Sequence, residues 1–537
     1  MSSQRRYFVL IPLFLGACAL LGGLFGPGAP SVAAAQQNGA AASDENIKSS
    51  LQAFTKVYDI VDENAAEKLS ADKAIYKGAI PGMLRTLDPH SNFLDSKDFA
   101  GLREEQHGKY YGIGMLIGPQ PRTGKAMVIH PFGGSPAYKA GIRPGDVLVE
   151  VNDKRVDTLS TTEVADMLRG PEGSKVQVVV SREGTNKPIT FNLVRGEIPR
   201  NSVDSAFWVK PGIAYLRIQS FTETTGQEVD DNLARLGENN IRGLILDLRG
   251  NPGGLLQEGV AVAGRWLDRG QVVVSHRGRA YNDKPYLARG SAYGEKYPIV
   301  VLVDRYSASA AEIVSGALQD HDRAWILGDT TFGKGLVQTV YPLSDNTGLL
   351  LTTQHYYTPS GRLIQRDYSN ISFLDYYYGK RSDTHSKTDI RETDLGRTVY
   401  GGGGIMPDEK YTPPKVDKFQ IDIGRKNGFF NFAALYFSNH STKLPKGWVP
   451  DEAVLNDFHD YLMKQGVQFT EADWTRDHGW IRDQLREQMY VTAFSFEDSQ
   501  KIAVQQDPEV QKAIAAMPQA MDLLTRSQTH YENRASR

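Results

Sequence analysis

The chain has 537 residues, of which 40% are hydrophobic, 23% charged and 10% aromatic, a composition typical of a globular protein with several domains. Its formal net charge is -2, from 61 basic and 63 acidic side chains, which argues against a nucleic-acid-binding protein. The single cysteine, Cys18, cannot form an intrachain disulfide, and it excludes cysteine-based zinc sites and thiol redox motifs.

Residues 1–43 have the features of an export signal followed by a spacer. A basic start precedes an uncharged segment whose apolar part covers residues 8–25, and Ala35 ends a small-residue cleavage site. Two alternatives tether the protein to the membrane: lipidation of Cys18, or an uncleaved anchor, since an apolar run of about 18–20 residues can span a bilayer. All three predict that the body of the protein works outside the cytoplasm, in the periplasm or cell envelope.

Residues 44–103 are predicted to be mainly helical. Apolar side chains recur at spacings of three and four between Ile47 and Val61, and a second helix is expected over residues 71–83. A packed helical cap is the simplest interpretation. The alternative is a dimerisation arm, which would make the protein a homodimer.

Residues 104–197 consist of short alternating strands separated by glycines. A Tyr-Gly-Ile-Gly-Met motif opens a strand at residues 111–115, and residues 134–146 read as helix, turn and strand. Together these motifs resemble a PDZ domain, a small β-barrel, inserted before the next unit. Its glycines let successive amides face one concavity that holds a peptide's terminal carboxylate. The expected peptide-binding residues are Tyr111, Gly112, Ile113, Gly114 and Met115.

Residues 202–408 alternate strands with helices. Continuous β-branched runs separated by helical segments predict a mainly parallel sheet that is covered on both faces, with the chemistry at the carboxyl ends of its strands. Residues 366–400 are polar and tyrosine-rich and are interpreted as a surface insertion. Residues 411–537 are predicted to be a mainly helical extension, and they carry no chemical signal.

Ser309 is the candidate nucleophile. It follows the strand predicted at residues 299–303 and lies at or near the start of a helix predicted over residues 308–319. A hydroxyl there is close to unpaired amides and to the positive helix end, which suits a reaction that passes through an oxyanion. The alternative is a purely structural N-cap, a role that Ser307 could equally fill.

Lys334 is the candidate general base. It lies between two glycines and beside Phe332, so it can enter an apolar pocket that lowers the lysine pKa from about 10.4 toward the ~7–8 that a base requires. Gln338 can orient this lysine only if the chain turns between them, because in a plain strand the two side chains lie ~13 Å apart.

A histidine base is the rival chemistry. His321 would lie ~18 Å from Ser309 along one helix and cannot share a proton with it. His90 and His355 stay open as candidates. No His-Glu-x-x-His pattern is present, so the common zinc peptidase route has no support. No cofactor is expected.

Residues 247–254 end a strand in a glycine-rich turn before a helix. Such a turn offers free amides to a developing oxyanion. Phosphate binding is disfavoured, because the lysine and hydroxyl of a P-loop do not follow. A tight connection without a chemical role is the simpler alternative.

These residues, together with the PDZ motifs, resemble the carboxy-terminal processing (tail-specific) serine peptidases. Matches at residues 82–91, 358–362 and 404–408 extend the resemblance over residues 47–408. The family implies an α/β core with a mainly parallel, crotonase-like sheet, and an exported endopeptidase without a metal, whose PDZ domain presents protein C-terminal tails.

By the same resemblance, Ser309 is the nucleophile, Lys334 the base and Gln338 its orienting residue. The implied oxyanion hole consists of Ala310 and of Gly253 or Gly254. Two function classes compete with this prediction: a non-catalytic PDZ adaptor that binds tails on a peptidase fold, and an acyl-transfer or hydratase enzyme on the same α/β fold.

Overall fold

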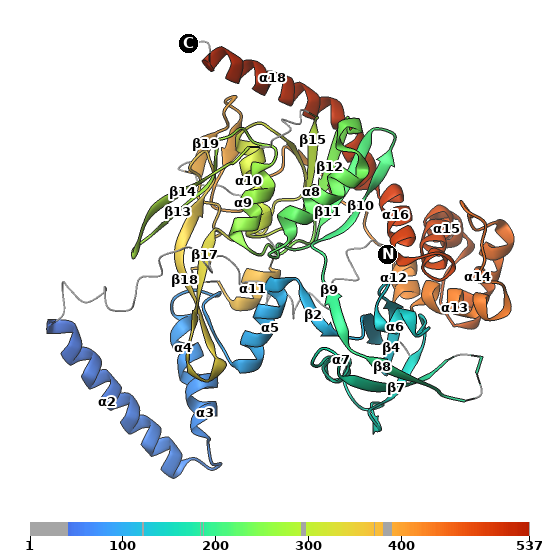
Figure 1. Ribbon diagram of the computed structural model, residues 1–537, viewed down its shortest axis with the longest axis horizontal. Coiled ribbons are helices and arrows are strands. Elements are labelled where there is room, and N and C mark those ends of the chain that lie inside the picture. The colour runs from blue at the N-terminus through green and yellow to red at the C-terminus, as the bar shows by residue number, and fades with distance from the viewer. Residues whose placement is uncertain are drawn as a thin grey trace.

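The computed structural model describes residues 41–120, 123–182, 184–185, 187–290, 297–369, 371–379 and 389–535. These residues form an α/β core, a small β-barrel and helical regions at both ends (Figure 1). The predicted export signal, with Cys18, lies outside the described residues. None of the helices in these ranges is both long and apolar enough to cross a membrane.

The core is built on a six-stranded sheet. In spatial order its strands are β10 (Val203–Lys210), β11 (Ile213–Ile218), β12 (Gly243–Asp247), β15 (Ile299–Val303), β16 (Trp325–Gly328) and β21 (Glu409–Lys410). The first pair is antiparallel and all later pairs are parallel. The sheet is therefore mixed, with parallel pairing from β11 to β21, a pairing that apolar strands buried on both faces favour.

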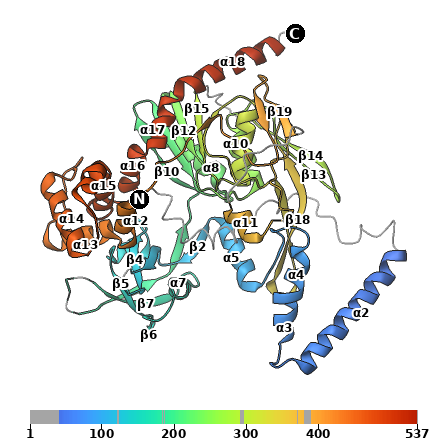
Figure 2. The ribbon, with the colours of Figure 1, turned by 180° about the vertical axis from the view of Figure 1, so that it is seen from behind.

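Helices cover both faces of this sheet. One face packs on α8 (Thr225–Leu236), α9 (Leu256–Gly264) and α10 (Ala310–Asp320), and the other on α17 (Pro508–Ala515) and α18 (Met517–Ala535). Successive side chains of a strand point to opposite faces of the sheet. Leu244 and Leu246 therefore pack on the face covered by α8, α9 and α10, whereas Ile245 packs on the face covered by α17 and α18. The C-terminal extension thus supplies one layer of the fold; Figure 2 shows α17 and α18 running along the sheet.

A second, antiparallel sheet lies beside the core and was not predicted. Its strands are β1 (Asn92–Leu94), β18 (Gly348–Tyr357), β13 (Val272–Gly278) and β14 (Tyr281–Leu287), and β17 (Leu336–Pro342) also pairs with β18. Most of β14 is exposed, so it lacks the continuous apolar pattern that reveals a buried strand. Short 3-10 turns occur at Glu238–Asn240 and Ser344–Asn346.

The predicted PDZ region forms a compact barrel. Its elements are β3 (Met115–Pro119), β4 (Ala126–Pro131), α6 (Pro136–Lys139), β5 (Val147–Val151), β6 (Lys154–Arg155), α7 (Thr161–Leu168), β7 (Lys175–Ser181) and β8 (Ile189–Val194). Entry strand β2 (Lys109–Gly112) pairs with exit strand β9 (Gly196–Pro199). This pairing brings both connections to the core together, as expected for an inserted domain.

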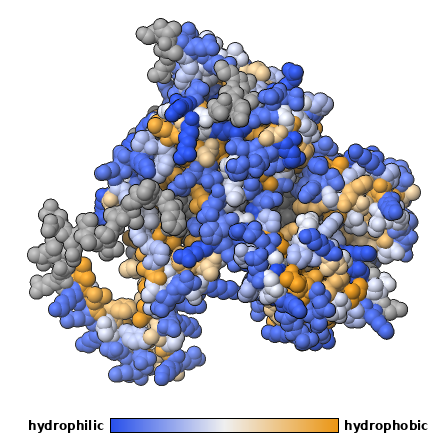
Figure 3. Space-filling view, in the orientation of Figure 1, coloured by the Kyte–Doolittle hydropathy of each residue, from blue (hydrophilic) through white to orange (hydrophobic). Residues whose placement is uncertain are grey.

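The N-terminal helix α2 (Ala41–Asn64) stands apart from the rest of the chain in both ribbon views (Figures 1 and 2). Its apolar residues are exposed, for example Leu51 and Val57 at 60% each, and Figure 3 shows hydrophobic side chains along it. The prediction of a packed cap is therefore wrong for α2. Amphipathic periodicity identifies the apolar face but not the surface that covers it.

The remaining N-terminal elements are shorter. The predicted second helix runs through α3 (Ala71–Ala74), a π-helical turn (Ile75–Ala79) and α4 (Ile80–Arg85), and α5 (Ser96–His107) follows β1. Phe99 of α5 packs with Leu94 and Leu350 in a small core of its own. This core attaches the segment after α4 to the antiparallel sheet.

The C-terminal extension begins with a helical bundle. Its helices are α12 (Lys418–Arg425), α13 (Gly428–Asn439), α14 (Glu452–Lys464), α15 (Glu471–Ala493) and α16 (Phe496–Gln506). Phe458, Ile481 and Leu485 are fully buried at its centre. Phe496 stacks on His130 of the barrel with ring centroids 4.1 Å apart. The extension therefore contacts both the core sheet and the barrel.

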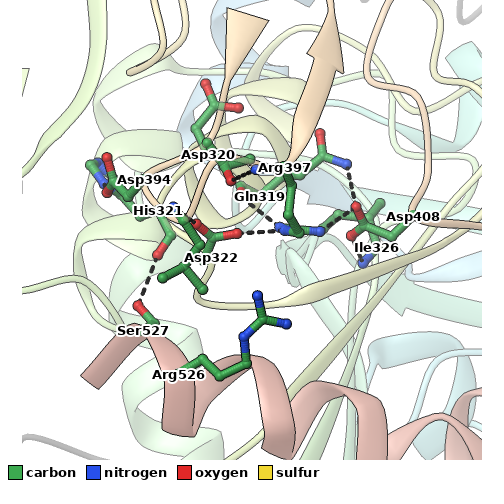
Figure 4. A network of polar contacts seen from close by, with 12 residues as sticks. Gln319, Asp320, His321, Asp322, Ile326, Asp394, Arg397, Asp408, Arg526 and Ser527 are labelled. Atoms are coloured by element: carbon green, nitrogen blue, oxygen red, sulfur yellow. Dashed lines mark hydrogen bonds and ion pairs between the residues drawn. The ribbon is translucent and has the colours of Figure 1, made fainter. Parts of the chain in front are cut away.

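The C-terminal part of the insertion, with β19 (Ile390–Glu392) and β20 (Thr398–Tyr400), is held at the end of α10. Figure 4 shows Arg397 between Asp322 and Asp408, and its Nη1 donates to Asp408 at 2.6 Å. His321 lies nearby, with Asp394 2.6 Å from Nδ1 and the Val272 carbonyl 2.8 Å from Nε2. Burial alone would lower the pKa of His321, but these two acceptors raise it above the ordinary value.

We expect Asp394→Asn to reduce the free energy of unfolding more at pH 5.5 than at pH 8.5. A histidine pKa that is raised in the folded state adds stability at low pH, and this stability is lost as the pH rises through the folded value. The loss at pH 5.5 should be about 1–3 kcal/mol. Urea unfolding at both pH values measures it, with Asp522→Asn, which breaks an exposed pair with Arg526, as control. An equal loss at both pH values would contradict this assignment.

Candidate active site

Ser309 occupies a strained position at the N-terminus of α10. Its φ of 52° and ψ of -115° lie outside the helical and extended regions, and a non-glycine residue held in such a conformation costs about 1–3 kcal/mol. The residue is 7% exposed, and its carbonyl accepts a hydrogen bond from the Tyr356 hydroxyl at 3.1 Å. The surrounding contacts therefore hold this serine in a conformation that an ordinary N-cap does not need.

Glu312, one turn into α10, connects Ser309 to the loop that carries Lys334. Its buried carboxylate accepts hydrogen bonds from the amides of Ser309 and Lys334, each at 2.9 Å and both to Oε2. The Gly333 amide at 2.7 Å and the Thr331 hydroxyl bind the other oxygen. Burial raises the pKa of Glu312, although these donors oppose the rise. Among the described residues four donors face the group, and the ionised form can accept from all of them.

Lys334 lies in the loop between β16 and β17 and is 3% exposed. The loop runs beside the strand-to-helix connection that carries the serine, because the Phe332 amide donates to the Ser307 carbonyl at 2.8 Å. Gly333 has a φ of 86°, and a Cβ there would lie 3.1 Å from the Gly404 amide nitrogen. Only glycine fits this backbone path without strain.

Gln338 is brought to the same region by a different route from the one predicted. No helical turn forms after Lys334; the chain enters β17, which has a β-bulge between Val337 and Gln338. Nε2 of Gln338 donates to the His90 carbonyl at 2.9 Å, while Oε1 is buried and has no hydrogen-bond partner among the described residues. The helical turn predicted for an orienting Gln338 is therefore absent from this described segment, and a β-bulge redirects the side chain there instead.

The glycine-rich turn after β12 abuts the serine. Gly253 has a φ of 97°, and a Cβ on it would lie 2.6 Å from Ser309 Cβ and 2.9 Å from the Ala310 amide nitrogen. Gly254 has a φ of 146°, and a Cβ there would collide with the Phe221 carbonyl oxygen at 2.0 Å. These contacts explain why both positions are glycine and bring the turn directly against the start of α10.

Of the histidines left open as alternative bases, His90 lies near Lys334 but has a tyrosine hydroxyl beside each ring nitrogen, whereas His355 faces away from Ser309. Hydroxyls of Tyr376 and Tyr377 lie 3.0 and 3.2 Å from the two ring nitrogens of His90, whose pKa is lowered by burial and by the charge of Lys334. His355 precedes Tyr356 on β18; since Tyr356 points to Ser309, His355 points to the opposite face. His321 caps the far end of α10.

The insertion reaches this site through α11 (Phe373–Tyr378). Tyr376 is 2% exposed and packs with Phe332 and Ala308, the neighbour of Ser309. The Arg366 guanidinium lies over the rings of both Phe332 and Tyr376, at 4.4 and 4.3 Å. The interpretation as a surface insertion is therefore wrong for α11, because Tyr376 and Tyr377 pack their rings on Phe332 of the lysine loop and keep their hydroxyls hydrogen-bonded.

The predicted carboxylate-binding loop connects β2 to β3. Gly114 has a φ of 74° and lies so close to Ser135 that a Cβ would come within 2.4 Å of Ser135 Cβ. Ser135 Oγ donates to the Gly114 carbonyl at 2.7 Å, and the Ala137 amide donates to the Ile113 carbonyl at 2.8 Å. The two carbonyls therefore point into the domain, and the amides of Ile113 and Gly114 donate to no described residue.

Comparison with known proteins identifies the family. Models of peptidase family S41 and of the PDZ domain match residues 212–370 and 133–182. A carboxy-terminal-processing protease from Bartonella bacilliformis is 37% identical over 328 residues, 60% of this chain and 74% of the relative. This chain belongs to the carboxy-terminal processing proteases of family S41. It is a serine-type peptidase.

Other relatives of this S41 peptidase are similar over the same extent. CtpB, a carboxy-terminal processing protease of Bacillus subtilis, is 32% identical over 61% of this chain and 68% of the relative. The solved structure of a photosystem II D1 C-terminal processing protease covers 68% of this chain and 88% of its own, at 30% identity and a TM-score of 0.35.

Sequence reasoning missed Glu312, although a signal was present. Ser309-Ala310-Ala311-Glu312 has the Ser-x-x-Glu spacing of a capping box, in which the glutamate accepts from the amide of the N-cap residue. The bond from the Ser309 amide fits that pattern, whereas the bonds to Gly333 and Lys334 could not be predicted from it. Within the described ranges, no three histidine, cysteine or acidic side chains are grouped as metal ligands would be.

We expect Glu312→Gln to destabilise this S41 peptidase by about 1–3 kcal/mol, because the new amide group would face donors that need an acceptor. Turnover should fall more than the loss of folded protein explains, since both the serine and the lysine backbones are held by this carboxylate. Thermal unfolding and kcat on one folded sample measure the two effects. Wild-type kcat in Glu312→Gln would contradict this role.

Proposed function

We propose that Ser309 and Lys334 form the catalytic dyad of this peptidase and that Gln338 orients the lysine. Ser309 Oγ attacks the scissile carbonyl while Lys334 Nζ takes its proton and later returns it to the leaving amine, and water then hydrolyses the acyl-enzyme. The observation that carries the proposal is the Glu312 carboxylate, one oxygen of which accepts from the amides of both residues.

The surroundings of Lys334 support its role as the base. The residue is 3% exposed, and burial disfavours the charged ammonium relative to the neutral amine. Lys334 and Gln338 both lie near His90. Burial is the largest cause of the lowered pKa of His90 and the charge of Lys334 is the next, while Gln338 Nε2 donates to the His90 carbonyl. The unpaired Oε1 of Gln338 is a suitable acceptor for an Nζ–H.

We further propose that the oxyanion hole uses the amides of Gly254 and Ala310. The Gly253 amide already donates to Asn251 Oδ1 at 2.8 Å, so it is less available to a substrate. Ala310 is the first residue of α10, and its amide has no partner within the helix. Two such amides beside a strained serine match the electrostatic requirement of acyl transfer.

The PDZ domain is proposed to bind the C-terminal tail of the substrate protein. The left-handed conformation at Gly114 and the inward-pointing carbonyls leave two successive amides for a carboxylate. The adjoining strand β3 could then accept the peptide as an added strand. Cleavage at or near protein C-termini follows from this capture, with Tyr111 to Met115 as the binding loop.

Three further assignments belong to the same proposal. Export to the periplasm or cell envelope rests on the sequence of residues 1–43, with a membrane tether if the signal is retained or Cys18 is lipidated. A homodimer is favoured by the exposed apolar side chains of α2. The parallel sheet with helices after its strands is consistent with a crotonase-like core.

We expect Ser309→Ala and Lys334→Met each to lower kcat by about 10⁴-fold or more while the protein still folds. The protein and its variants are incubated with an unfolded protein that ends in small apolar residues, and fragments are identified by mass spectrometry. Cleavage retained by either variant would refute the dyad. No cleavage by the unmodified protein, with tight tail binding, would instead support an adaptor.

Amidation of a peptide's C-terminus should weaken its binding at least about tenfold, since the neutral group loses its charge-assisted bonds to the loop amides. Fluorescence anisotropy with the Ser309→Ala variant measures this without cleavage. A peptide with an internal sequence change but a free carboxylate serves as control. Equal affinities for the acid and the amide would refute the assignment of residues 111–115 as the carboxylate-binding loop.

A further inference from the structure

Arg249, in the turn after β12, is held by carboxylates from two distant parts of the chain. Its Nη1 donates to Asp507 at 2.9 Å and to Glu509 at 2.8 Å. Its Nη2 donates to Asp247 at 2.6 Å. Asp507 is the N-cap of α17 and Glu509 lies in its first turn. The C-terminal extension therefore contacts the glycine-rich turn through two residues that lie 258 and 260 positions after Arg249 in the sequence.

This ion-pair cluster is largely shielded from solvent. Side-chain exposure is 15% for Arg249, 2% for Asp247, 7% for Glu509 and 22% for Asp507. Burial alone would raise the pKa of Asp247, but the Arg249 guanidinium brings it below the ordinary value. Removing one partner of a buried charge cluster leaves the others uncompensated, so the cluster acts as a unit.

Arg249 is also tied to the backbone that leads to the candidate oxyanion hole. Its own amide donates to Asp247 Oδ1 at 2.9 Å, and the next amide, of Gly250, donates to Asp304 Oδ1 at 2.9 Å. Asn251 then connects the turn to the serine, because its carbonyl accepts from the Ala308 amide at 2.9 Å. A shift of Arg249 would therefore be passed on to Gly253 and Gly254.

We propose that α17 is a positioning element for catalysis: Asp507 and Glu509 hold Arg249, and thereby hold the amides of the turn where the oxyanion forms. The inference rests on the proposed function, because it assigns the Gly253–Gly254 turn to the oxyanion. Neither carboxylate touches the substrate. Their contribution is to keep the donors in place before the reaction, when a displacement of about 1 Å is costly.

The same cluster makes the positioning depend on pH. Burial raises the pKa of Glu509 to about 7, with Arg249 opposing the rise and Asp247 and Asp507 adding to it. Protonation of Glu509 below this value weakens its pair with Arg249. The other charged or titratable groups around the cluster are Asp204, Tyr215, Arg217, Asp304 and Tyr411.

The test compares Glu509→Gln and Asp507→Asn/Glu509→Gln with a matched control on the same helix. Lys512→Met removes an ion pair of 2.8 Å with Glu409, which joins α17 to β21 without reaching the turn. We expect the two cluster variants to lose about tenfold in kcat with unchanged KM, while Lys512→Met stays within about twofold of the unmodified protein. The kcat of the unmodified protein divided by the kcat of Glu509→Gln should approach 1 below pH 7, because Glu509 is then protonated in the unmodified protein.

Three results would overturn the proposal: unchanged kcat in both cluster variants, an equal loss in Lys512→Met, or a kcat ratio that does not vary with pH. Thermal unfolding of every variant separates a loss of folded protein from a loss of kcat. The proposed function is judged separately. If Ser309→Ala cleaves as the unmodified protein does, the dyad fails; if only the cluster variants behave like wild type, the positioning role alone fails.

Discussion

A buried carboxylate, that of Glu312, is the contact on which the site depends. It joins the amide of Ser309 to the amides of Gly333 and Lys334, so the start of α10 and the loop before β17 cannot move apart without leaving charged or polar groups unpaired in the interior. The strained conformation of Ser309 is tolerated because this bond and the Tyr356 hydroxyl over-determine its backbone.

The rest of the fold surrounds this contact with further restraints. The glycine turn after β12 presses against the serine, α11 packs its tyrosines on Phe332, and α17 holds Arg249 at the base of the turn. Regions far apart in the sequence thus converge on one strand-to-helix junction. Preorganisation of this kind lets backbone amides stabilise charge without rearranging during the reaction.

The sequence was sufficient to predict those strands and turns that depend mainly on neighbouring residues in the chain. Strands 213–218 and 299–303 coincide with β11 and β15 because short, mainly apolar runs of this length favour strands in the interior of a sheet, and the glycine motif of the PDZ loop requires the left-handed conformation seen at Gly114. The candidate residues Ser309 and Lys334 were identified by their motifs. The exposed strand β14, the contacts of α11 and the pairing of Arg249 with Asp507 and Glu509 depend on tertiary packing, which no local pattern encodes.

The most direct test of the central claim is the rate at which a fluorophosphonate labels Ser309. This rate is measured in the unmodified protein, in Glu312→Gln and in Lys334→Met. Mass spectrometry of the modified peptide identifies the labelled residue in each protein. Our account predicts a single label on Ser309, with a rate that collapses when Lys334 is replaced and falls when Glu312 is replaced. Labelling of a different residue, or a Ser309 rate that is the same in all three proteins, would contradict it.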